Sequence, residues 1–134
     1  KTSGGKGLHV VAPLIRRATW DELKNYTRTL AMETAQNHPA GFVANMSKAK
    51  RKGKIFIDYL RNSFGATSIA TYGTRALSGA PVSTPVSWDE LSSIPSSQAF
   101  TLTTLPKRLK TLTTDPWKGF FDLRQSLSRS SLTS

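Results

Sequence analysis

The hydrophobic residues of the chain fall into short runs with the spacing of strands. Residues 8–15, LHVVAPLI, form a nearly continuous apolar run, which is typical of a central strand buried on both faces. Residues 54–60, KIFIDYL, and residues 99–105, AFTLTTL, are the other strand candidates. Alternation within 54–60 places Asp58 among apolar side chains. A carboxylate in such a position is costly unless it is paired, hydrogen-bonded or bound to a cation.

Helix start signals stand between these runs. In TWDEL, Thr19 and Glu22 form a capping box, and the helix that follows is expected to end at residues 37–39, Asn-His-Pro, because proline cannot continue it. Ser87 and Glu90 repeat the box in SWDEL and predict a second start.

Two further helices are predicted near the C-terminal end. Pro106 opens a short helix with the sequence KRLKTL, and Asp115-Pro116 is a typical start for a last helix, WKGFFDLRQSL. Strands that alternate with helices predict a mixed α/β domain. We expect this domain to occupy residues 1–127 as one body, with residues 128–134, SRSSLTS, forming a disordered tail.

Composition narrows the possible partners. The chain has 19 Lys and Arg against 8 Asp and Glu, a net charge of +11, which indicates a polyanionic partner such as nucleic acid, or else a merely basic surface. No apolar run is long enough to span a membrane and no signal peptide is recognisable, so a cytoplasmic location is expected. Cysteine is absent and only two histidines are present, so a metal would be held mainly by carboxylates, which favours Mg²⁺ or Mn²⁺.

The glycine-rich start, SGGKGLH, is suited to phosphate. Its glycines allow amide groups to face one concavity, while Ser3, Lys6 and His9 offer a hydroxyl, a charge and a further donor. It has neither the frame of a Walker A loop nor the strand-to-helix position of a dinucleotide-binding fingerprint. From the residues alone, a phosphate site and a plain glycine turn are equally good interpretations.

A second basic stretch precedes the strand candidate at 54–60. It either clamps a nucleic-acid backbone or forms a solvated hairpin, and its cations are Lys48, Lys50, Arg51, Lys52 and Lys54. Beyond it, Asp58 and Arg61 could form a structural ion pair, or could act as a metal ligand beside an anion-binding arginine.

Three stretches together carry a resemblance to one family. The sequences TSGGKGLHV, NMSKAKRKGKIFIDYLRN and GAPVSTPVSWDEL resemble the polymerase domain of bacterial DNA ligase D, the multifunctional ligase of non-homologous end joining. That domain belongs to the archaeo-eukaryotic primase superfamily, and the similarity extends to about Leu127. It implies a mixed sheet flanked by helices, forming part of a primase-type polymerase core.

The resemblance also implies roles for particular residues. Asp58 corresponds to a catalytic ligand of divalent metal ions, and the positions that match nucleotide-triphosphate contacts are Ser3, Lys6, His9, Arg61 and Arg75. The implied partners are DNA ends and NTP or dNTP, and the implied reaction adds a nucleotide to a DNA 3′-end with Mg²⁺ or Mn²⁺. The implied location is the bacterial cytoplasm, in association with the nucleoid.

One departure from the family pattern limits this expectation. The family's first metal motif is a D-x-D pair upstream of the glycine turn, and no two aspartates of this chain have that spacing. The chain therefore resembles the C-terminal half of the domain and is expected to be inactive alone, needing the N-terminal half or a ligase domain in cis or in trans. The alternatives are a non-catalytic module that binds DNA or nucleotides, and a remnant without function.

Overall fold

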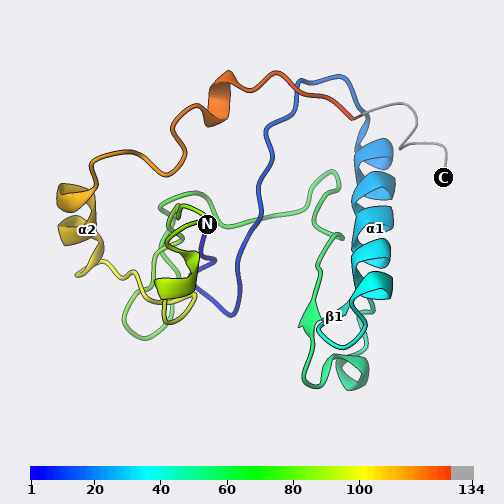
Figure 1. The fold of residues 1–134 in the computed structure, drawn as a ribbon, viewed down its shortest axis with the longest axis horizontal. Helices are drawn as coiled ribbons and strands as arrows, with labels where there is room; N and C mark the ends of the chain where they lie inside the picture. The colour runs from blue at the N-terminus through cyan, green and yellow to red at the C-terminus, as the bar shows by residue number, and fades with distance from the viewer. Residues whose placement is uncertain (128–134) are drawn as a thin grey trace. The chain divides into compact units, whose positions relative to one another are not determined.

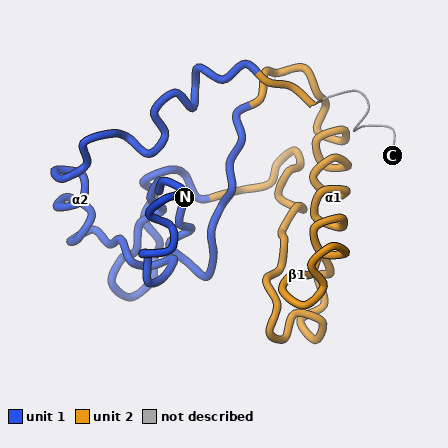
Figure 2. The backbone as a smooth tube through the Cα atoms, viewed as in Figure 1, with its two compact units in different colours: residues 1–13, 69–124 blue, residues 14–68, 125–134 orange. Residues whose placement is uncertain are grey.

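The structure is a computed structural model that describes residues 1–127; the predicted tail lies outside these residues. The chain forms two compact units (Figures 1 and 2). Unit 1 contains Lys1–Pro13 and Ile69–Arg124, and unit 2 contains Leu14–Ser68 together with the described residues 125–127. Each unit is described by itself below. Within residues 1–127, no helix is both long and apolar enough to cross a membrane.

Unit 2 is built on the helix α1, Trp20–Asn37, whose start follows the predicted capping box. The Glu22 amide donates to the Thr19 hydroxyl at 3.3 Å, and the Glu22 carboxylate accepts the Thr19 amide at 2.7 Å. The Glu22 carboxylate also accepts the Thr19 hydroxyl at 2.8 Å, and the two bonds that it accepts, from the Thr19 amide first and the hydroxyl second, lower the pKa of the Glu22 carboxyl. The helix ends at Asn37, and the amide of the C-cap residue His38 donates to the Thr34 carbonyl at 3.0 Å. Both predicted boundaries of this helix are confirmed.

A small parallel sheet contacts this helix. Strand β1, Phe42–Val43, pairs with β2, Ile55–Phe56, in a register that joins Phe42 to Ile55 and Val43 to Phe56. The connection between them contains the basic stretch, of which Lys48–Arg51 forms a 3₁₀ helix. On α1, Ala31 is the buried residue, and α1 contacts β1.

Unit 1 is organised around a central segment, residues 81–84, which is almost fully buried. The Thr2 amide donates to the Thr84 carbonyl at 2.9 Å, and the Val82 amide donates to the Phe100 carbonyl at 2.7 Å. The Tyr72 amide donates to the Ser83 carbonyl at 2.7 Å. Segments that are distant in sequence are thus joined through one short stretch of backbone. Helix α2, Leu105–Thr111, has Pro106 in its first turn, as predicted, and buries Leu105.

Two of the expected strands are wrong. In residues 8–15, only Leu8 makes a bridge, to Thr2, and the side chains that should be buried lie at the surface, Val10 being 82% exposed. The reason is that no neighbouring strand in unit 1 pairs with this segment beyond Leu8. In residues 99–105, only Thr101 makes a bridge, to Pro81, and α2 already begins at Leu105.

The strand expected at 54–60 is present but short. It comprises Ile55 and Phe56 only, so Asp58 lies beyond its end, with 40% of its side chain exposed. The expectation of a carboxylate buried among apolar side chains is therefore wrong. Solvent and hydrogen bonds stabilise its charge, and the desolvation cost that made it notable in the sequence does not arise.

The other two helix starts produce only single turns. After SWDEL, the Glu90 amide donates to the Ser87 hydroxyl at 3.3 Å, but only the 3₁₀ turn Leu91–Ser93 follows. After Asp115, whose carboxylate accepts the Trp117 amide at 2.8 Å, the chain forms the 3₁₀ turn Phe120–Asp122. The left-handed Gly119, with φ +78°, breaks the expected helix before this turn.

Replacing Thr19 by Ala should destabilise unit 2. The substitution removes the hydroxyl that accepts the Glu22 amide, and losing such a cap costs about 1 kcal/mol. We expect this decrease in the free energy of unfolding, measured by urea titration with far-UV circular dichroism. Thr19→Ser keeps the oxygen acceptor, so its free energy of unfolding should be close to that of the unsubstituted chain. Equal loss in the two variants would contradict the assigned role of the hydroxyl.

Candidate nucleotide and nucleic-acid site

The glycine turn at residues 3–7 is closed by its own serine. The buried Ser3 hydroxyl accepts the amides of Gly5 at 3.1 Å and Gly7 at 3.2 Å, and the Ser3 amide donates to the Gly7 carbonyl at 2.9 Å. Two of the glycine amides expected to face a phosphate are thus used inside the turn. The sequence left a phosphate-binding concavity and a plain glycine turn as equal alternatives, and the structure has a turn organised by Ser3.

Arg75 packs directly on this turn. Its Nε donates to the Ser3 carbonyl at 3.1 Å, and its own amide donates to the Pro81 carbonyl at 2.8 Å. Gly4 has a φ of +63°, and a Cβ at this position would lie 3.1 Å from the Arg75 Cγ and 3.2 Å from the Pro81 carbonyl oxygen. Glycine is required here both for the backbone conformation and for the close approach of Arg75.

The other two candidate residues of unit 1 lie beside the turn. Lys6 is exposed at its tip, and His9 is half-buried, with its amide donating to the Lys1 carbonyl at 2.8 Å. Lys1 donates from Nζ to the Ile69 carbonyl at 2.6 Å. Burial, and then the charge of Arg75, lower the pKa of the Lys1 ammonium. The structure thus brings Ser3, Lys6, His9 and Arg75 into one region of unit 1 that is rich in positive charge.

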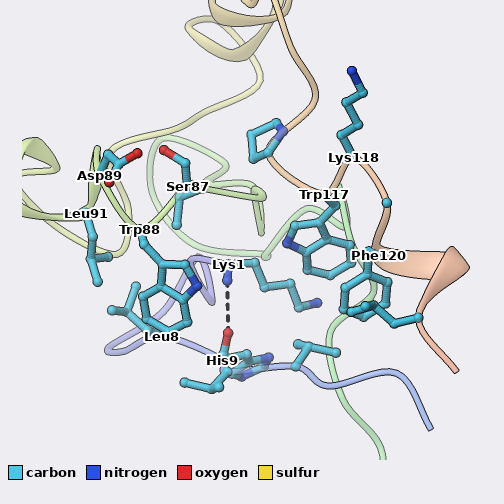
Figure 3. Close-up of a pocket in the computed structure, with 16 residues that line it drawn as sticks. Lys1, Leu8, His9, Ser87, Trp88, Asp89, Leu91, Trp117, Lys118 and Phe120 are labelled. Atoms are coloured by element: carbon cyan, nitrogen blue, oxygen red, sulfur yellow. Dashed lines mark hydrogen bonds between the residues drawn. The ribbon is translucent and has the colours of Figure 1, made fainter. Parts of the chain in front are cut away.

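His9 also lines a cleft of about 620 Å³ in unit 1 (Figure 3). Trp88 and Leu8 stand on one side of the cleft, Trp117 and Phe120 stand on the other, and Lys1 lies between them. The rings of Trp117 and Phe120 stack with centroids 4.6 Å apart and planes at 15°. The two tryptophans were not identified from the sequence. In the sequence, each of these tryptophans follows a predicted helix start, and neither belongs to the apolar face of a predicted helix.

In unit 2, Asp58 and Arg61 form the ion pair that was one of the two interpretations of their spacing. Arg61 Nε lies 3.4 Å from Asp58 Oδ2, and both side chains are well exposed. The other Asp58 oxygen accepts the Leu60 amide at 3.2 Å, and Arg61 Nη1 donates to the Thr67 carbonyl at 2.9 Å. Both oxygens of the carboxylate therefore have partners.

The donors around Asp58 do not by themselves fit a divalent metal site. Among residues 1–127, no group of three or more His, Cys, Asp or Glu side chains is placed to hold a metal. Mg²⁺ and Mn²⁺ sites for phosphoryl chemistry take several carboxylate oxygens, and this one is already paired with Arg61. We derive no step through a metal from these residues alone.

The cations of the basic stretch differ in what they contact. Arg51 lies over the Phe56 ring, with its Cζ 3.7 Å from the centroid, and donates to the carbonyls of Asn45 at 3.3 Å and Met46 at 2.6 Å. Its guanidinium therefore holds the loop together. The four lysines, by contrast, are exposed, namely Lys48, Lys50, Lys52 and Lys54.

The predicted site residues therefore form two sets. The unit 1 set is the glycine turn with Lys6, His9 and Arg75, and the unit 2 set is the Asp58–Arg61 pair with the basic stretch. The contacts described above join residues within one unit at a time.

Comparison with known proteins places these features in a family. The family model described as "LigD, primase-polymerase domain" matches residues 1–117. The chain is 45% identical over 129 residues to the multifunctional non-homologous end joining protein LigD of Pseudomonas aeruginosa, covering 96% of this chain and 15% of that protein. It is 32% identical to the bifunctional LigD of Bacillus subtilis, covering 82% of this chain and 18% of that protein.

A solved structure is similar as well. The polymerase domain of Mycobacterium tuberculosis ligase D, in complex with DNA, matches with a TM-score of 0.79 at 29% identity. The match covers 89% of this chain and 41% of that domain. It confirms the mixed α/β fold class predicted from the sequence. The chain thus spans less than a fifth of these LigD proteins and under half of the solved polymerase domain.

Replacing Gly4 by Ala should destabilise unit 1. In the left-handed region an alanine is less stable than a glycine by about 1 to 2 kcal/mol. Its Cβ would also lie too close to the backbone at Pro81. We expect a lower midpoint in urea or heat denaturation. Gly7→Ala is the matched control, because no atom lies within 4 Å of a Cβ at that position. If both variants unfold alike, the close packing assigned to Gly4 is wrong.

Proposed function

The chain belongs to the LigD primase-polymerase domain family, and from this premise we propose that it forms part of the polymerase domain of a DNA repair ligase. In this proposal the complete domain adds NTP or dNTP to a DNA 3′-end during non-homologous end joining. This chain contributes residues that bind the nucleotide and the DNA backbone. The proposed setting is the bacterial cytoplasm, at DNA ends associated with the nucleoid.

The contact between Arg75 and the glycine turn is the observation that carries the nucleotide proposal. Arg75 lies 72 residues from Ser3 in sequence, yet its Nε donates to the Ser3 carbonyl at 3.1 Å. This contact holds a guanidinium on the turn whose exposed residues include Lys6, and cations at a turn of fixed conformation suit a triphosphate. We assign triphosphate binding in unit 1 to Ser3, Lys6, His9 and Arg75. For Arg61, which belongs to unit 2, a nucleotide contact is proposed from the family resemblance alone. The role of Ser3 is to fix the turn.

The four exposed lysines of the basic stretch support the DNA proposal. Their ammonium groups lie on a loop that Arg51 stabilises through Phe56, so the charges are presented from a defined backbone. Lysine contacts to phosphate position a protein on DNA without reading its sequence, which suits an enzyme that acts on any broken end. Arg51 is assigned to the same surface, with its loop contacts as a second role.

Metal-dependent nucleotidyl transfer takes several carboxylates at one site, and among residues 1–127 no group of three or more His, Cys, Asp or Glu side chains is placed to hold a metal. We propose that Asp58 binds Mg²⁺ or Mn²⁺ only when acidic residues from the rest of the domain supply further ligands to the same ion. Its ion pair with Arg61 favours a second candidate for the chain alone, a module that binds DNA and nucleotides without polymerising. The proposed protein partners are the remaining part of the polymerase domain and a ligase domain, in cis or in trans.

Removing the Lys6 charge should weaken nucleotide binding. We expect Lys6→Ala to raise the ATP dissociation constant about tenfold, equivalent to roughly 1.4 kcal/mol, by the loss of one charge-assisted hydrogen bond. Isothermal titration calorimetry measures the change.

Lys107→Ala is the control for this titration, because Lys107 is also an exposed lysine of unit 1 but lies on α2, outside the turn. It should change the ATP affinity less than about twofold, a small effect on the same affinity scale. Equal effects of the two substitutions, or no measurable ATP binding by the parent chain, would refute the nucleotide assignment.

DNA binding should depend steeply on salt. If the four lysines each contact one phosphate, the slope of log K against log salt concentration is about −3 to −4. The double variant Lys50→Gln/Lys52→Gln should reduce its magnitude by about 2, because each lysine that contacts a phosphate contributes about 1. Fluorescence anisotropy of a labelled duplex at several salt concentrations gives the slope.

The matched control removes two charges from α2. Lys107→Gln/Lys110→Gln lowers the net charge by the same amount on another exposed surface, and it should leave the slope close to that of the parent. A reduction as large as that of the first pair would mean that net charge, and not the basic stretch, governs binding.

A further inference from the structure

A turn from a distant part of the sequence lies against the glycine turn. We call residues 96–99 the serine turn; within it, the Gln98 amide donates to the Ser96 hydroxyl at 3.2 Å. The Gly4 amide donates to the Ser97 carbonyl at 3.1 Å, so the two turns are joined through their backbones. Both turns belong to unit 1.

Two side chains of the serine turn donate to the same carbonyl of the glycine turn. The Ser97 hydroxyl donates to the Gly5 carbonyl, and Gln98 Nε2 donates to the same oxygen at 3.2 Å. These donors lie 92 and 93 residues from Gly5 in sequence. A carbonyl oxygen has two lone pairs, so the two donors occupy it fully and fix its direction.

The direction of the Gly5 carbonyl determines where the Lys6 amide points. The two groups belong to one planar peptide, and no peptide bond in residues 1–127 is cis. In a trans peptide the C=O and the N–H point in opposite directions, so a carbonyl held toward the serine turn directs the Lys6 N–H away from that turn. Donors on the carbonyl also polarise the peptide, which makes its N–H a stronger donor.

The Lys6 amide is the one amide of the glycine turn that remains available. The other amides of this turn all have acceptors, namely those of Ser3, Gly4, Gly5 and Gly7. Over the described residues 1–127, no acceptor is placed for the amide of Lys6, which is an exposed residue. A free N–H on a residue that also carries an ammonium group is suited to an anion.

The two bonds to Gly5 contribute little to the stability of the fold. Gln98 is exposed and Ser97 is half-buried. A hydrogen bond between groups that water can reach adds little net free energy, because the unfolded chain forms the same bonds with water. The core of unit 1 lies in the central segment, residues 81–84. What the bonds to Gly5 determine is the orientation of one peptide.

We propose that Ser97 and Gln98 are positioning residues of the triphosphate site. Through the Gly5 carbonyl they direct the Lys6 amide toward a phosphate oxygen, and neither side chain touches the nucleotide itself. The inference rests on the nucleotide binding proposed above, and it assigns to the serine turn the control of that site.

The first test measures the glycine turn without any nucleotide. The whole isotope-labelled chain is compared with the double variant Ser97→Ala/Gln98→Met, in which methionine keeps the length of glutamine but has no donor. The heteronuclear NOE of the Gly5 and Lys6 amides should fall in the variant, because this observable reports fast backbone motion and the peptide has lost both contacts. Its far-UV circular dichroism spectrum should be unchanged.

The second test adds ATP to the same proteins. In the unsubstituted chain the Lys6 amide proton should shift downfield as ATP saturates the site, and the double variant should lose this shift. Calorimetry should show the dissociation constant raised about tenfold, as expected when a hydrogen bond to a charged group is weakened.

Ser92→Ala is the matched control for both tests. Ser92 is an exposed serine of unit 1 that lies outside the serine turn. This variant should keep the heteronuclear NOE of the unsubstituted chain, and its ATP dissociation constant should change less than about twofold, a small step on the affinity scale. Equal effects of Ser92→Ala and the double variant would contradict the proposal.

The single variant Gln98→Met decides the matter if the double variant does not fold. It changes only an exposed side chain, and it should raise the ATP dissociation constant about threefold, because the Gly5 carbonyl keeps its bond from Ser97. No change in this variant would then overturn the proposal.

Two results would overturn the inference and leave nucleotide binding in place. One is unchanged ATP affinity in the folded double variant while Lys6→Ala weakens binding. The other is a Lys6 amide proton that does not move when ATP saturates the unsubstituted chain. If that chain binds no ATP at all, the nucleotide proposal itself is refuted, and the positioning role falls with it.

Discussion

The structure of unit 1 depends on one constraint, which is that the backbone of the central segment is buried and must find hydrogen-bond partners inside the protein. An unpaired buried amide or carbonyl costs as much as a lost hydrogen bond. Thr2 bonds to both Ser83 and Thr84: the Ser83 hydroxyl donates to the Thr2 carbonyl at 2.8 Å, and the Thr84 amide donates to the Thr2 hydroxyl at 3.0 Å. The position of the glycine turn therefore follows from the central segment.

Arginines and lysines divide the positive charge of the chain between two tasks. Arg51 lies over Phe56, Arg75 donates to the glycine turn, and Arg108 lies over Phe100 while its Nη2 donates to Glu90 and to the Pro85 carbonyl. A planar guanidinium stacks on rings and forms several directed bonds, whereas an ammonium remains a hydrated point charge. Arginines thus brace the loops, and lysines on the basic stretch and α2 carry charge to the solvent.

The sequence predicts the elements that are encoded locally. The start and end of α1 are correct because a capping box and a proline act within a few residues, and the start of α2 follows Pro106 in the same way. Strand predictions depended instead on burial. Val10 and Asp58 are both misplaced because the apolar pattern shows what a segment can bury, not whether its partner is present.

The site was predicted in part for the same reason. Ser3, Lys6 and His9 are neighbours in the chain, so their proximity could be expected, and the resemblance added Arg75. The internal use of the glycine amides depends on the path of the turn, which residue types do not specify. Pairing of Asp58 with Arg61 was one of two alternatives open from their spacing, and the structure has that pair. The tryptophans of the cleft come together only in three dimensions.

The arrangement of the two units has a consequence for synthesis. Unit 2 is largely one continuous insertion between the two stretches that form unit 1. Thr2 bonds to Thr84 across a separation of 82 residues. At about 5 to 20 residues per second, the ribosome needs several seconds to make the intervening chain. During that interval the glycine turn is without its partners while α1 and the small sheet already have theirs. The inserted unit can fold first, and the glycine turn, although it is translated before that unit, gains its partners only afterwards.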